Sequence, residues 1–100
     1  MSLQEQQNQF SNDIVKLIAY LQGMGYWVTF GESFAETPKC TEMTHAKRLA
    51  FDLNLYLDGA YLFANKDYVV AGKYWEKLNK KNRAGVFKHK PMPNHFERAI

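Results

Sequence analysis

The sequence predicts an α+β domain in which a small antiparallel sheet has helices packed on one side. Residues 49–56 alternate between apolar and polar side chains, which is typical of a half-buried strand. Apolar residues recur at helical spacing in residues 4–22 and again in residues 67–79. Strands and helices do not alternate regularly along the chain, so a doubly wound parallel sheet is not expected.

The N-terminal third predicts one helix followed by one strand. Residues 4–22 place an apolar stripe on one helix face, made of Phe10, Ile14, Leu17, Ile18 and Leu21. Gly23 and Gly25 are expected to end this helix. Residues 26–30 are aromatic and β-branched, which predicts a strand. The polar, proline-containing residues 31–44 predict a loop.

The alternation in residues 49–56 assigns each side chain to a face of the predicted strand. Three leucines and a phenylalanine share one face, and the other face carries Ala50, Asp52, Asn54 and Tyr56. Asp52 is therefore expected to point away from the apolar face, toward the side where a cleft can lie. Asp58-Gly59 signals a tight hairpin turn, after which residues 61–63 are expected to return antiparallel.

The last third of the chain predicts a second helix and two short strands. One face of the helix predicted at residues 67–79 carries an apolar stripe that is expected to be buried. It consists of Tyr68, Ala71, Trp75 and Leu78. Asp67 suits the first turn of this helix, where a negative charge meets the positive end of the helix dipole. Residues 85–87 and 95–97 predict short strands on either side of a proline-containing loop.

Composition indicates one domain spanning residues 1–100. The chain is 46% hydrophobic and 15% aromatic, which is enough for a single core, and Trp27, Tyr74 and Trp75 are expected in that core or in a groove wall. No apolar run is long enough for membrane insertion, and the polar first residues lack the regions of a signal peptide, so a cytoplasmic protein is expected. The one cysteine, Cys40, excludes an internal disulfide and a cysteine-based zinc site.

Positive charge is concentrated in the last quarter of the chain. The net charge is +3, and the basic run consists of Lys77, Lys80, Lys81, Arg83, Lys88 and Lys90. Such a run is most often a solvated helix end and loop, and it also suits an acidic partner surface. No aromatic-interleaved or helix-turn-helix pattern accompanies it, so nucleic-acid binding is the weakest functional alternative.

Two histidines and one aspartate match the ligand set of a catalytic zinc site. The residues are His45, Asp52 and His95, and three protein ligands leave a fourth position for water. Neutral imidazole and carboxylate both suit Zn²⁺. Two alternatives remain open on spacing alone: the three residues coincide by chance, or Asp52 only caps a turn or pairs with Arg48. The oligomeric state is not visible in the sequence.

Three segments of the chain resemble the M15 family of zinc peptidases. They are THAKRLAFDLNLYLDGAYL at 44–62, DYVVAGKYWEKL at 67–78 and PNHFE at 93–97. The opening helix and residues 25–32 also look like this group, so the resemblance covers nearly the whole chain. More narrowly, the chain looks like the small phage and prophage members that cut peptide cross-links in bacterial cell walls. The resemblance implies a fold like that of D-alanyl-D-alanine carboxypeptidases, with the zinc ligands His45, Asp52 and His95.

Three positions depart from the family pattern around this site. The family carries an acidic general base three residues before its last histidine, and this chain has Met92 there. In the family an arginine usually stands soon after the Gly-Glu of the first strand, but residues 33–38 contain none here. Met43 replaces a usual serine. A general base contributes about 10²–10⁴-fold and an oxyanion-stabilising group about 10²–10³-fold, so these losses predict a very slow enzyme.

Glu97 and Glu36 are the main candidate substitutes for the missing base, and Glu42 and His89 are further candidates. Either Glu97 or Glu36 would need to come within hydrogen-bond reach of a zinc-bound water. Glu97 has two other interpretations, because it stands two residues after His95. It either orients that histidine or forms a surface ion pair of little energetic consequence.

The resemblance and its departures lead to two functional expectations. The first is a phage-derived protein that keeps the zinc peptidase fold, has lost or reduced hydrolysis, and binds or inhibits a host enzyme or defence complex. The second is an active zinc-dependent peptidoglycan peptidase of the endolysin type, which cleaves amide bonds of stem peptides. The partner is a host protein in the first case and a cell-wall peptide in the second. Either protein would be made in the host cytoplasm and released only by another factor.

Overall fold

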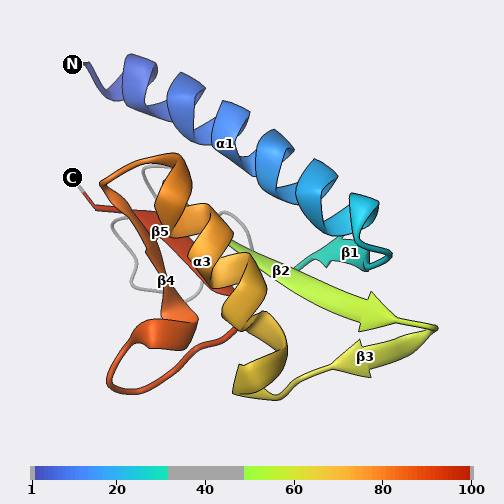
Figure 1. Cartoon of the computed structure of the whole chain (residues 1–100). Coiled ribbons are helices and arrows are strands. Elements are labelled where there is room, and N and C mark those ends of the chain that lie inside the picture. The colour runs from blue at the N-terminus through green and yellow to red at the C-terminus, as the bar shows by residue number, and fades with distance from the viewer. Residues whose placement is uncertain (1, 32–48, 100) are drawn as a thin grey trace.

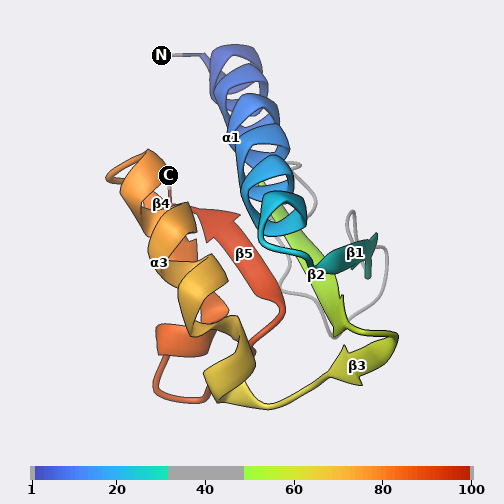
Figure 2. The same ribbon diagram turned by 45° about the vertical axis from the view of Figure 1, so that its right-hand side comes forward.

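The computed structural model describes residues 2–31 and 49–99. In this part of the chain, two helices pack on one side of a five-stranded antiparallel sheet (Figures 1 and 2). In chain order the elements are α1 (Leu3–Gly23), β1 (Trp27–Phe30), β2 (Ala50–Leu57), β3 (Ala60–Leu62), the 3₁₀ helix η1 (Asn65–Tyr68), α3 (Val69–Leu78), β4 (Asn82–Ala84), the 3₁₀ helix η2 (Gly85–Phe87) and β5 (His95–Arg98). The predicted α+β class is confirmed. No helix among the described residues is both long and apolar enough to cross a membrane.

The predicted N-terminal helix is confirmed as α1. Its first turn is closed by a capping box, in which the Ser2 hydroxyl accepts from the Glu5 N–H and the Glu5 carboxylate accepts from the Ser2 N–H, both at 3.1 Å. The helix ends at Gly23, and Gly25 takes a positive φ of 97° that turns the chain toward β1. The buried face includes residues of the predicted stripe: Phe10, Leu17 and Leu21.

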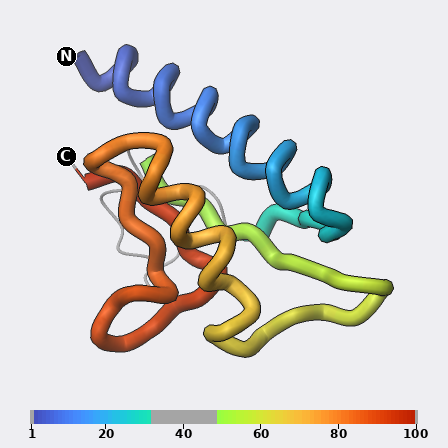
Figure 3. Tube along the Cα trace, in the orientation of Figure 1, coloured from blue at the N-terminus to red at the C-terminus, as the bar shows by residue number. Residues whose placement is uncertain are grey.

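The sheet is built around β2, the longest strand. The strand order is β1-β2-β5-β4, and β3 also pairs with β2. The turn between β2 and β3 is the predicted hairpin, because Asp58 and Gly59 adopt positive φ values of 52° and 82°. Figure 3 shows this hairpin extending away from α3 at one end of the molecule.

Register places the side chains of β2 on two different faces. Leu53 pairs with Phe30 and Leu55 pairs with Val28, and the buried leucines of β2 lie on the helix-facing side. Asn54 pairs with Thr29, and Asp52 pairs with His95 on the other side. The predicted alternation is therefore confirmed, and Asp52 faces away from the helices.

An aromatic cluster fills the space between the helices and the sheet. Trp75 of α3 contacts Phe10, Phe51 and Phe96, with ring centroids 5.3–6.1 Å apart and the rings edge to face. The indole N–H of Trp75 donates to the backbone oxygen of Glu97 at 3.0 Å. Trp75 is fully buried, as predicted, and it fixes α3 over β5.

The second predicted helix begins with a 3₁₀ turn. Residues Asn65–Tyr68 form η1, which includes Asp67, and α3 continues from Val69 to Leu78. The Tyr68 hydroxyl donates to the Leu62 carbonyl at 2.7 Å and accepts from the Leu55 N–H at 3.1 Å. Burial raises the pKa of Tyr68 to about 12, against the opposing effect of the Leu55 hydrogen bond.

The predicted strand at residues 85–87 is wrong. These residues form η2, and the strand β4 lies just before them. The Gly85 carbonyl accepts from the N–H groups of Lys88 and Met92 at 3.2 and 3.1 Å, so the chain turns there instead of continuing the ladder. A Cβ on Gly85 would meet the Met92 carbonyl oxygen, so a side chain has no room at this turn.

A buried ion pair joins the last strand to the first helix. The Arg98 guanidinium donates to the Asp13 carboxylate at 2.8 Å and to the Asn82 side chain at 3.3 Å. It also donates to the side chains of Gln6 and Gln9, both at 3.2 Å. Arg98 and Asn82 are fully buried, so this cluster is part of the core.

Candidate metal centre

His95 and Asp52 meet across the β2–β5 ladder on the outer face of the sheet. They are direct register partners, and His95 Nδ1 lies 3.1 Å from Asp52 Oδ1. Directly opposed residues of an antiparallel pair have close Cβ atoms, so this contact follows from the register. Two of the three predicted metal ligands, 43 positions apart in the sequence, are thus brought together.

Glu97 holds the other nitrogen of the same imidazole. It follows His95 by two positions on β5, so both side chains lie on one face. Its Oε1 lies 2.7 Å from His95 Nε2 and 2.7 Å from Lys88 Nζ. Glu97 therefore holds the ring of His95 and also forms an ion pair with Lys88.

The contacts within this cluster favour the imidazolium form of His95 and the carboxylate form of Glu97. Burial lowers the pKa of His95, but the hydrogen bonds and charges of Asp52 and Glu97 outweigh that effect and raise the pKa to about 9. The hydrogen bond from His95 lowers the pKa of Glu97, and with the help of Lys88 it overcomes desolvation, so that the pKa falls to about 2. Glu97 is thus firmly a carboxylate at neutral pH.

The loop before β5 closes tightly around His95. The His95 N–H donates to the Met92 carbonyl at 3.0 Å, and the Leu53 N–H donates to the Asn94 carbonyl at 2.9 Å. The Asn94 side chain donates to Asn54 at 3.1 Å. The backbone N–H of His95 is therefore bonded to Met92, the preceding Asn94 is bonded to β2, and the imidazole ring lies between two carboxylates. His95 is only 5% exposed.

Met92 occupies the position where the resemblance calls for a general base. Its backbone is fixed by the two hydrogen bonds with Gly85 and His95, and its side chain lies toward solvent, with 49% of the residue exposed. A thioether is a weak acceptor that takes up no proton near neutral pH.

The pair formed by His95 and Asp52 fits a zinc site in donor type. The 3.1 Å between His95 Nδ1 and Asp52 Oδ1 is a hydrogen-bond distance, so zinc would have to displace the proton on Nδ1. The contact from Glu97 to the far nitrogen is the outer-shell arrangement that metal-bound histidines commonly have.

The remaining predicted site residues lie outside the described part of the chain. These are the third ligand His45, the candidate base Glu36 and the position of Met43. Within residues 2–31 and 49–99, no three His, Cys, Asp or Glu side chains gather around one metal position.

Trp27 was expected in the core or a groove wall, and its 67% exposure excludes the core. Val28 and Phe30 take the helix-facing positions of β1, so Trp27 falls on the outer face, opposite Tyr56. Tyr56 in turn pairs with Tyr61, and their ring centroids are 5.4 Å apart. Alternation along residues 27–30 was the signal in the sequence for this outward position.

Comparisons of the chain with models of protein families, with curated proteins and with solved structures give no match.

Proposed function

We propose that this chain has the fold of M15 zinc peptidases and is a phage-derived binding or inhibitor protein whose hydrolysis is lost or reduced. Its metal ligands would be His45, Asp52 and His95, and its target would be a host enzyme or defence complex. Zinc bound there would supply Lewis acidity and a water of lowered pKa. The active peptidoglycan peptidase is the alternative.

The observation that carries the proposal is the shared imidazole of His95. One ring nitrogen faces Asp52, a predicted ligand, and the other is held by Glu97. An imidazole fixed in this way has its ring orientation set before any metal arrives. A chance coincidence of three residues in the sequence would not require two of them to be register partners on one sheet face.

The same contacts argue against Glu97 as the base of a hydrolase. Its carboxylate is shared between His95 and Lys88, and its pKa of about 2 makes it a weak proton acceptor. Met92 supplies no substitute. Within residues 2–31 and 49–99, the predicted ligand His95 is oriented but neither Glu97 nor Met92 can serve as a base, which favours binding over hydrolysis.

Zinc content tests the ligand assignment. Protein prepared with excess zinc should retain one zinc per chain by elemental analysis, and Asp52→Ala and His95→Ala should lose it. Thr29→Ala is the control, because Thr29 is exposed on the same sheet face in β1 and is not a proposed ligand. Wild-type protein without zinc under these conditions would remove the metal from the proposal.

Clearing of purified cell walls tests the loss of hydrolysis. We expect little clearing by the wild type and chelator-sensitive clearing by Met92→Glu, which returns a carboxylate to the missing position. The gain should be about 10²-fold, the low end for general-base catalysis, because the family's arginine is also missing. Met92→Gln is the control of similar shape without a base. Strong chelator-sensitive clearing by the wild type would favour the active peptidase.

A further inference from the structure

A hollow lies between α1 and α3, on the opposite side of the sheet from His95. It has a volume of about 310 Å³ and is lined by Tyr20, Val70, Lys73, Tyr74 and Lys77. Tyr20 of α1 and Tyr74 of α3 stack with ring centroids 3.9 Å apart and planes 6° from parallel. Val70 is 40% exposed and contributes an apolar wall, and Lys73 and Lys77 contribute two cationic side chains. We name it the α1–α3 groove.

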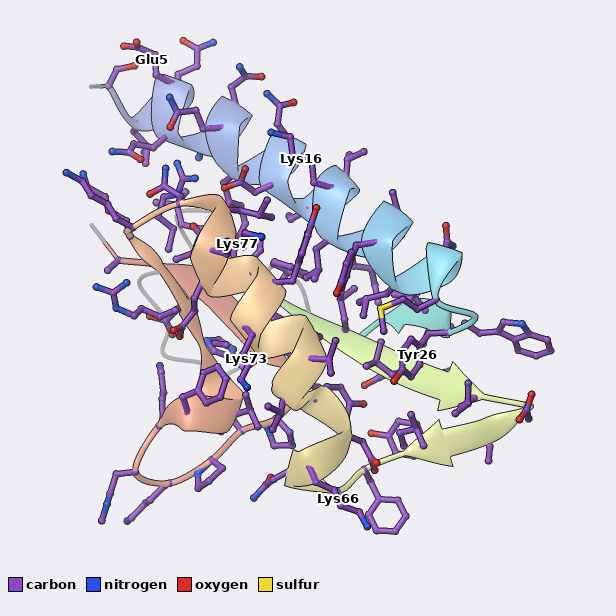
Figure 4. All side chains as sticks on the ribbon, in the orientation of Figure 1. Glu5, Lys16, Tyr26, Lys66, Lys73 and Lys77 are labelled. Carbon is purple, nitrogen blue, oxygen red and sulfur yellow. The ribbon has the colours of Figure 1, made fainter. Side chains whose placement is uncertain are left out.

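The positive charge of this groove is not neutralised by the described residues. Lys73 and Lys77 lie one turn apart on α3, and neither forms a salt bridge with a carboxylate in residues 2–31 or 49–99. Figure 4 shows both lysines on α3 and Lys16 on α1. Glu76, next to Lys77 in sequence, accepts a hydrogen bond from the Ala84 N–H at 2.9 Å and forms no salt bridge with either lysine.

We propose that the α1–α3 groove binds an acidic polypeptide segment of a partner protein that carries an apolar side chain between its carboxylates. The apolar side chain would enter the hollow against Val70 and the tyrosine pair. The flanking carboxylates would pair with Lys73 and Lys77, and they would relieve the repulsion between two like charges four residues apart. This inference goes beyond the proposed function and does not depend on the metal centre.

The geometry favours a polypeptide over a nucleic acid. Tyr20 and Tyr74 cover each other's facing surfaces, so no base can insert between them. The hollow is at the lower end of the size of ligand pockets, which suits one or two side chains. Single-stranded nucleic acids are typically bound by aromatic rings with open faces along a longer basic track.

Fluorescence anisotropy with the peptide acetyl-Glu-Glu-Leu-Phe-Glu-Glu-amide tests the proposal. The double variant Lys73→Glu/Lys77→Glu should weaken binding by about tenfold or more. The matched control is Lys80→Glu/Lys81→Glu, which makes the same charge change at exposed positions outside the groove and should stay within about threefold. Circular dichroism of each variant would check that it is folded.

The apolar part of the groove is tested separately. Val70→Ser should weaken the peptide with Leu-Phe at its centre and leave a peptide with Ser-Ser there unchanged. His95→Ala should not affect either peptide, so failure of this proposal is distinct from failure of the metal centre.

Three results would overturn the proposal. One is no measurable binding of the Leu-Phe peptide, and another is equal loss in the two double variants, which would indicate diffuse electrostatic attraction. The third is tighter binding of a single-stranded oligothymidylate with the same dependence on Lys73 and Lys77, which would assign the groove to nucleic acid.

Discussion

The two faces of β5 carry charged clusters of contrasting kinds. On the helix-facing side, Arg98 is fully buried and donates hydrogen bonds to Asp13, Asn82 and two glutamines. On the outer side, His95 is flanked by two carboxylates whose side chains remain 17% exposed. The side chains of Arg98 and Asp13 are 1% and 10% exposed, so the inner cluster is more deeply buried than the carboxylates of the outer cluster.

The inner cluster is therefore placed to hold the fold, whereas the outer cluster is the more accessible to solvent. The inner cluster connects α1, β4 and β5, and removal of one partner would leave a charge without compensation in the core. The carboxylates of the outer cluster can exchange a contact for water or a metal at lower cost. Variants on the two faces should therefore differ in their effect on stability and on binding.

The largest effect is expected from Asp13→Ala, which leaves the Arg98 guanidinium buried without its carboxylate. The free energy of unfolding should fall by about 3–5 kcal/mol, measured by urea denaturation. The control is the double variant Asp13→Leu/Arg98→Met, which replaces the ion pair by apolar side chains and should recover most of this loss. A loss below about 1 kcal/mol in Asp13→Ala would mean that the inner cluster does not hold the fold.

The second-largest loss of stability is expected from Gly85→Ala, because Gly85 packs against the loop that positions His95. The new Cβ would meet the Met92 carbonyl oxygen and lie 3.0 Å from His95 Cβ, so backbone atoms must shift. We expect a loss of about 3 kcal/mol and a change in the His95 ring signals in nuclear magnetic resonance spectra. Gly23→Ala is the control, because a Cβ there meets nothing within 4 Å. Unchanged His95 signals in Gly85→Ala would contradict the close support.

A smaller effect is expected from Tyr68→Phe on the helix-facing side. The variant leaves the Leu55 N–H and Leu62 carbonyl without the hydroxyl, which should cost about 2 kcal/mol at neutral pH. The pKa of Tyr68 is about 12 in the folded chain and 10.0 for an ordinary tyrosine, so the unfolded state loses its proton first. The advantage of the wild type over Tyr68→Phe should therefore shrink as pH rises from 10 to 12. An advantage that stays constant over this range would contradict the raised pKa.

Local periodicity made most of the fold predictable. The alternation in β2, the helical stripe of α1 and the Asp58-Gly59 turn each depend on neighbours in sequence, and all three are confirmed. The strand predicted at residues 85–87 was wrong because Gly85 packs against the loop before β5, a contact that no local pattern encodes.

The candidate site was predictable in part for the same reason. Alternation placed Asp52 on the outer face, but only the register makes it the partner of His95. The sequence left two roles open for Glu97, and the contacts show that it serves both His95 and Lys88. The pairing of Asp13 with Arg98 spans 85 positions and has no signal in either local segment.

The smallest effect on stability, and the largest contrast with Asp13→Ala, is expected from Asp52→Asn. The amide can keep a hydrogen bond to His95, and Glu97 still holds the other ring nitrogen, so the free energy of unfolding should fall by less than about 2 kcal/mol. Loss of a proposed ligand should nevertheless weaken zinc binding by more than about 100-fold, whereas Glu97→Gln should weaken it by about 10–100-fold. Competition with a chromogenic chelator measures both affinities. If Asp52→Asn instead lost as much stability as Asp13→Ala and bound zinc normally, the outer cluster would be a second element of the core, and the contrast between the two faces of β5 would disappear.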